Sequence, residues 1–254
     1  MKVRAILIRG RNLPAFTIAM FAIFIVAAVD SSARGSKSSY FRFEEFAESQ
    51  LFLEENATDG DLGVHFKVDG EPWNRVILFD SRWRKLVDVR VTGNSRVIGL
   101  TELFNESAEP SFDDLPREDF LKLFPEGEYR FYGRMVDGGW LGGLAELTHT
   151  MPEQPTILSP EEGEEIDVSE PLTVEWKPIP DPAGSEIVNI IVVVEKDEDG
   201  ERTRVVSADM DPSATQFTLA PGFLEPGKDY KVELLAEETT GNKIISEQEF
   251  ETEE

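Results

Sequence analysis

Apolar and polar residues alternate with a period of two along several stretches of the chain, among them residues 64–68, 87–91 and 230–236. In such a stretch every second side chain points to the same face, so one face can be buried while the other is solvated. Turn residues, mainly Pro and Gly, separate the stretches. The pattern is typical of half-buried strands and predicts an all-β fold.

One segment has helical spacing instead. Pro116 suits the first turn of a helix, Phe120 and Phe124 are four residues apart and share one face, and Pro125 cannot continue the helix. We expect a short helix at residues 116–124, inserted among the strands.

A turn at Pro226 and Gly227 leads into the clearest alternating stretch, in which Tyr230 is the first inward residue. Pro fixes its φ angle and Gly tolerates positive φ, so this pair predicts a tight turn. A tyrosine placed after such a turn resembles the tyrosine corner of β-sandwiches, whose hydroxyl bonds to nearby backbone. The stretch from Leu224 to Ala236 is similar to the F strand of fibronectin type III domains.

The resemblance to fibronectin type III covers about residues 153–252. It implies strand A at 157–160, strand B at 172–178 with Trp176 in the core, strand C at 187–194, a C–C′ turn at 197–200, strand E at 217–219 and strand G at 243–250. The chain departs from the family in two ways, since strand C lacks its common aromatic residue and Arg-Gly-Asp is absent. The second departure removes the best-known adhesive motif of the family.

Residues 124–131 repeat the arrangement in the N-terminal half, with a Pro/Gly turn before Tyr129. We therefore expect residues 49–151 to form a second β-sandwich that carries the helix, and residues 152–252 to form the fibronectin type III-like domain. Residues 34–48 are expected to be a linker. The predicted fold class is all-β, with two tandem Ig-like or fibronectin III-like β-sandwiches, the first with a short helix insertion, after an N-terminal signal peptide.

The N-terminal segment has the composition of a signal peptide. Basic residues precede an apolar core from Ala15 to Val29, and the small residues that end at Ala33 fit a cleavage site. The alternative is an uncleaved anchor whose apolar stretch is counted from Leu13. We expect residues 1–33 to direct export, so that the protein is secreted or held in the periplasm or cell envelope. We expect no other segment to contact a membrane.

Composition narrows the range of partners. Fifty acidic and 25 basic residues give a net charge of −25, which repels nucleic acid and anionic lipid. The chain has no cysteine, which excludes disulfides and thiolate chemistry and fits bacterial export better than a typical animal ectodomain. We expect a protein or glycan partner at the cell surface.

The sequence contains no pattern of an assembled catalytic site. Its two histidines, His65 and His149, have no second histidine at ligand spacing and no nucleophile motif beside them, and phosphate-cradling glycine loops are absent. We interpret both histidines as surface or interdomain residues. The prediction is a non-enzymatic protein with no catalytic residue and no cofactor.

One loop has the composition of a cation site. Asp59 and Asp61 belong to the glycine-bearing acidic segment 56–61, and clustered oxygens of this kind can hold Ca²⁺, although the spacing is not that of an EF-hand. Two interpretations stay open, a calcium site and a polar turn between two strands.

Two tryptophans are candidates for contact with a ligand. Trp83 lies in a small basic island between two apolar runs, at an expected hairpin tip, and Trp140 lies in a Gly-rich hairpin. An exposed indole beside arginines can stack on a sugar ring or grip an acidic glycan. The alternative is that each ring folds back onto its own sheet.

Residues 190–194 are apolar on both faces of one strand, so part of this run must point away from the core. With Ile191 and Val193 outward, Leu235 on the neighbouring strand would extend an apolar strip, and such strips mark contact surfaces. The alternative is that a loop or the first domain covers it. We therefore expect an exported, non-enzymatic β-sandwich binding or scaffold protein acting through protein–protein contacts. A carbohydrate-binding accessory protein that uses exposed tryptophans is the alternative.

Overall fold

The computed structural model describes residues 42–198 and 200–254. The expected signal peptide or anchor at residues 1–33 lies outside these residues. Within the described part, no helix has both the length and the apolar character that a membrane crossing requires.

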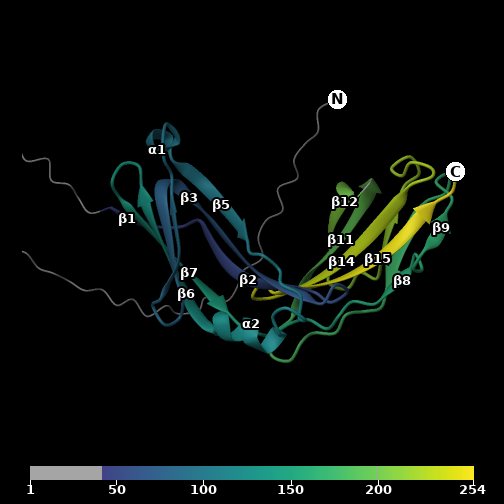
Figure 1. The fold of residues 1–254 in the computed structure, drawn as a ribbon, viewed down its shortest axis with the longest axis horizontal. Coiled ribbons are helices and arrows are strands. Elements are labelled where there is room, and N and C mark those ends of the chain that lie inside the picture. The colour runs from purple at the N-terminus through teal and green to yellow at the C-terminus, as the bar shows by residue number, and fades with distance from the viewer. Residues whose placement is uncertain (1–41, 199) are drawn as a thin grey trace, which may run out of the picture. The chain divides into compact units, whose positions relative to one another are not determined.

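The structure consists almost entirely of strands (Figure 1). The elements in chain order are β1 (Phe43–Glu45), β2 (Glu48–Asn56), β3 (Asp61–Phe79), β4 (Lys85–Arg90), α1 (Ser95–Ile98), β5 (Leu100–Glu106), α2 (Arg117–Leu123), β6 (Gly127–Met135), β7 (Trp140–Leu147), β8 (Ile157–Ser159), β9 (Glu164–Ile166), β10 (Leu172–Trp176), β11 (Ile187–Glu198), β12 (Glu201–Met210), β13 (Gln216–Leu219), β14 (Asp229–Glu238) and β15 (Lys243–Thr252). The all-β prediction is confirmed, and the expected helix is α2.

The C-terminal half forms two sheets. One has the strand order β13-β10-β8, and the other contains β12-β11-β14-β15, whose strands run side by side in Figure 1. Alternate side chains of the two sheets form one buried hydrophobic cluster that includes Trp176, Val192, Val232 and Phe250. Every strand implied by the resemblance is present, so the fibronectin type III or Ig-like sandwich is confirmed here.

The N-terminal half is organised around β3. Its first part pairs with β2 and β5, and its second part pairs with β4 and β6, with register shifts between Asp69 and Arg75. Strands that bend in this way pass from one layer of a sandwich to the other. The enclosed core includes Trp73, Phe131 and Phe120, which is the buried residue of α2.

The prediction of a linker at residues 34–48 is wrong for residues 42–48, which are the part of it that the structure describes. Residues 43–45 form β1, which pairs with β7 in parallel, and Phe46 is buried in the core. The physical reason is that Gly133 and Gly143 have no Cβ, which leaves space for the Phe46 ring against their strands.

The two halves share backbone hydrogen bonds. β15 pairs with β2 in parallel, with Lys243 opposite Glu54. The buried Asn242 side chain accepts from the backbone N–H of Leu53 and donates to the carbonyl oxygens of Thr148 and Thr150. One sheet therefore continues through both halves. The expected domain boundary after residue 151 stays a prediction.

Candidate functional site

The loop between β3 and β4 is held by one buried carboxylate. Asp80 is fully buried and accepts hydrogen bonds from the backbone N–H groups of Arg82 and Arg84 and from Nε of Arg84, at 2.9, 2.7 and 2.6 Å. Burial alone would raise its pKa, but these bonds outweigh burial and hold the pKa of Asp80 below its ordinary value. These three hydrogen bonds therefore hold the loop in one defined turn conformation.

This loop presents Trp83 to solvent. The Trp83 side chain is 58% exposed, and its φ of 63° is the only positive φ of a non-glycine residue in the described part of the chain. The guanidinium of Arg130 lies 4.3 Å from the centre of the indole, and the Phe79 ring lies 6.2 Å away. A strained backbone that exposes a large aromatic side chain is typical of functional contacts.

The surroundings of Trp83 are basic, although the whole chain is strongly acidic. Arg82 is exposed next to it, and the Asp88 carboxylate on β4 accepts from Arg75, Lys85 and Arg90. The bond from Arg75 is the main reason that the pKa of Asp88 lies far below its ordinary value. Arg84 is paired with Asp80 and Arg130 with Glu128, so the positive charge offered to an acidic group on a ligand is mainly that of the exposed Arg82.

Trp140 is half-buried rather than solvent-facing. The guanidinium of Arg134 lies 4.9 Å from the centre of the Trp140 ring. The backbone N–H of Trp140 donates to the carbonyl oxygen of Arg42. The backbone of Trp140 thus takes part in the pairing of β1 and β7, and its half-buried side chain offers less free surface than that of Trp83.

The expected apolar strip is not a free surface. Val193 and Leu235 are 3% and 8% exposed, and Ile191 is half-buried, whereas Ile190, Val192 and Val194 point into the core. The physical reason is lateral packing in the sheet. Ile191, Leu235 and Ile245 are in register across β11, β14 and β15, so each covers the flank of the next. The prediction of a partner surface at Ile191, Val193 and Leu235 is therefore corrected, because these residues pack against neighbouring strands of the same chain.

The acidic loop at 56–61 forms a hydrogen-bonded turn. The side-chain oxygen of Asn56 accepts from the backbone N–H groups of Thr58 and Asp59, at 3.0 and 3.2 Å. Asp61 has one buried carboxylate oxygen with no hydrogen-bond partner among the described residues. Calcium binding by Asp59 and Asp61 stays a prediction.

The interpretation of His65 as a surface residue is wrong, because the residue is buried, whereas the alternative of an interdomain position stays a prediction. Its side chain is 3% exposed and stacks on Phe52, with ring centres 5.1 Å apart. It occupies the polar side of an alternating strand, but the aromatic rings of neighbouring strands cover that side. His149 is half-buried, and its Nε2 lies 2.8 Å from the carbonyl oxygen of Phe124.

The two corner tyrosines lie at equivalent turns. Tyr230 is buried and its hydroxyl accepts from the backbone N–H of Glu225 at 2.8 Å, after a turn in which Gly227 has a φ of 64° and follows Pro226. Tyr129 is buried and its hydroxyl donates to the carbonyl oxygen of Pro125 at 2.9 Å. Burial raises the pKa of Tyr129 to about 12, so the donor proton is retained.

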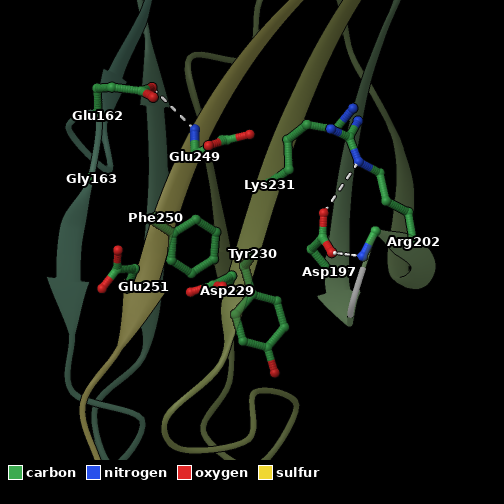
Figure 2. Close-up of a pocket in the computed structure, with 11 residues that line it drawn as sticks. Glu162, Gly163, Asp197, Arg202, Asp229, Tyr230, Lys231, Glu249, Phe250 and Glu251 are labelled. Atoms are coloured by element: carbon green, nitrogen blue, oxygen red, sulfur yellow. Dashed lines mark hydrogen bonds and ion pairs between the residues drawn. The ribbon is translucent and has the colours of Figure 1, made fainter.

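A shallow acidic depression lies beside Tyr230 (Figure 2). Glu249 and Glu251 contribute carboxylates to it, but Lys231 and Arg202 supply positive charge on the same wall, and Arg202 lies 3.8 Å from Asp197. Five acidic and two basic residues line the depression, so it keeps an excess of negative charge after these pairings.

Solved structures with similar folds are distant from this chain. Fibronectin(III)-like modules of Clostridium thermocellum CbhA are 10% identical with a TM-score of 0.34, covering 82% of this chain and 93% of that one. The FN1–FN3 domains of chicken CNTN1 are 9% identical with a TM-score of 0.35, covering 83% and 64%. The human OSCAR ligand-binding domain is 15% identical with a TM-score of 0.28, covering 82% and 97%.

No curated protein matches the chain. Residues 159–250 match a protein family described as the Kre9/KNH-like N-terminal Ig-like domain. These residues run from the end of β8 to β15 and contain both sheets of the C-terminal half. Ig-like and fibronectin type III folds generally serve as binding or scaffold domains. The C-terminal half of this chain is therefore similar to that Ig-like domain and has the fold of a fibronectin type III or Ig-like sandwich.

Proposed function

We propose that the protein is an exported, non-enzymatic binding protein that engages a partner protein at the cell exterior or envelope through the Trp83 loop. The single observation that carries the proposal is the geometry of Trp83, an indole that is 58% exposed on a backbone of positive φ. The N-terminal sequence supports export, and the Ig-like fold supports a binding or scaffold role.

The loop has the properties of a binding hot spot. Tryptophan and arginine are the side chains that most often dominate the energy of protein interfaces. Asp80 fixes the backbone on both sides of Trp83, so little conformational entropy is lost when a partner docks. The exposed Arg82 favours a partner whose contact surface is acidic.

A glycan ligand is the second candidate, because an indole face can stack on a sugar ring. Arg130 already covers one side of the Trp83 ring at 4.3 Å. The surface left for a sugar is therefore the opposite side and the edge of the indole.

The test compares the purified protein with the variants Trp83→Asn and Trp83→Phe. Asn accepts positive φ more readily than most residues, so Trp83→Asn removes the indole and keeps the loop conformation. We expect capture of a partner from host envelope extract to fall about tenfold or more with Asn, and less with Phe. The matched control is Trp140→Phe, which should capture as the wild type does.

A glycan array run beside the capture experiment separates the two candidates. Glycan signals that disappear with Trp83→Asn would favour the carbohydrate-binding function. Equal capture by the wild type and Trp83→Asn, with no glycan signal, would overturn the assignment of this loop.

A further inference from the structure

A cluster of two carboxylates and one imidazole is centred on β3, in contrast to the basic residues of the Trp83 loop. Glu54, His65 and Glu109 each offer a ligand atom, and these atoms lie within 4.8 Å of one another. Glu54 comes from β2, His65 from β3, and Glu109 from the segment after β5. Three separate segments of the chain therefore bring two carboxylates and one imidazole together.

The backbone register explains how the cluster forms. Phe52 is opposite His65 and Glu54 is opposite Gly63, so all four positions share one face of the β2–β3 pair. Gly63 has no side chain, and Glu109 occupies the vacated space. A Cβ at position 63 would lie 2.7 Å from Oε1 of Glu109.

The imidazole of His65 is held rigidly but is not hydrogen-bonded. The side chain is 3% exposed and lies between Phe52, at 5.1 Å, and Phe104, at 5.8 Å. Neither of its ring nitrogens has a hydrogen-bond partner among the described residues. Because an unpaired polar group in the interior lowers the stability of the fold, such a group generally serves a purpose.

The spacing suits a metal ion better than a hydrogen bond. Nε2 of His65 lies 3.5 Å from Oε1 of Glu109, and the contact lacks hydrogen-bond geometry. Two ligands of one tetrahedral zinc ion, each at about 2.0–2.2 Å from the metal, are separated by about 3.3 Å. A carboxylate oxygen of Glu54 lies within 4.8 Å of the ligand atoms of both His65 and Glu109, so Glu54 can complete a three-ligand set.

The charges around the cluster also favour a cation. Burial first, and then the neighbouring charges of Asp61, Glu54 and Glu106, raise the pKa of Glu109 to about 7. Burial, with a smaller contribution from Lys243, lowers the pKa of His65 to about 4. The carboxylates thus repel one another, and a divalent ion would relieve that repulsion.

We propose that Glu54, His65 and Glu109 form a binding site for a single divalent transition-metal ion of the zinc class. The imidazole ligand selects this class over Ca²⁺ and Mg²⁺, which prefer oxygen ligands throughout. The Glu109 side chain is 33% exposed, so the ion can enter from solvent and keep a water as its fourth ligand.

The test is isothermal titration calorimetry of the purified full chain with ZnCl₂, on protein made without a polyhistidine tag. We expect one Zn²⁺ per chain, and a melting temperature that rises with Zn²⁺ through mass action on the folded state. His65→Gln and Glu109→Gln should each weaken Zn²⁺ binding by about tenfold or more.

The matched control is His149→Gln, which removes the other histidine and should leave Zn²⁺ binding unchanged. Glu109 is partly exposed, so Glu109→Gln keeps the test valid even if the buried His65→Gln variant does not fold. Zn²⁺ binding that is weak and multiple, that survives in folded Glu109→Gln, or that CaCl₂ reproduces at equal concentration would overturn the proposal.

Discussion

Asp80 and His65 lie on or next to the same strand, and both are buried polar groups, but their surroundings differ. Asp80 accepts three hydrogen bonds and has no unpaired oxygen, whereas neither ring nitrogen of His65 has a partner in the described structure. The hydrogen-bonded Asp80 carboxylate fixes the loop backbone that exposes Trp83. An unsatisfied buried group keeps its bonding capacity for a ligand. The Trp83 loop is thus suited to a large partner, and the His65 cluster to an ion.

The largest expected effect is that of Asp80→Ala. Removing this carboxylate leaves the N–H groups of Arg82 and Arg84 without their acceptor, so the free energy of unfolding should fall by about 2 kcal/mol. Urea denaturation measures the loss. The control is Asp88→Ala, whose ion pairs lie closer to the surface and should cost less. Equal losses for the two variants would contradict the role of Asp80 as the frame of the loop.

A smaller effect of the opposite sign is expected for His65→Phe. The substitution removes two unpaired nitrogens and keeps an aromatic ring against Phe52, so the free energy of unfolding in EDTA should rise by about 1 kcal/mol. The stabilising effect of Zn²⁺ should disappear in the same variant. In His149→Phe, by contrast, the hydrogen-bonding position next to Phe124 is lost and stability should fall. Destabilisation of metal-free His65→Phe would show that the imidazole is already satisfied.

The smallest effect on stability is expected for Gly63→Ala. The new Cβ would meet the flexible carboxylate of Glu109, which can swing toward solvent, so the free energy of unfolding should change by about 0.5 kcal/mol or less. Zn²⁺ affinity should nevertheless fall, because one ligand is displaced. Calorimetry of the double variant with Glu109→Gln checks this, since the two losses should not add.

The sequence predicted the strands better than it predicted the sites. The period-two pattern and the turn at Pro226 located the C-terminal sandwich, because both signals depend on residues close together in the chain. The helix α2 followed from the spacing of Phe120 and Phe124. The sequence does not predict β1, because three residues, Phe-Glu-Glu, are too few to show a period and their pairing with β7 is a long-range contact.

The metal cluster could not be predicted in the same way. Glu54, His65 and Glu109 are far apart in the sequence, and no motif spacing relates them. The apparent surface position of His65 followed from the polar side of its strand, which Phe52 and Phe104 cover only after β2 and β5 pair with β3. The one local signal is Gly63, a residue without a side chain among larger residues of the alternating strand.

The parallel pairing of β15 has a consequence for association between copies. β15 lies at one side of its own four strands, and an uncovered strand in that position can recruit the strand of another molecule. Here β2 covers residues 243–245 and β9 covers residues 250–252. A foreign strand therefore finds both ends of β15 occupied, which protects a disulfide-free chain against edge-to-edge aggregation.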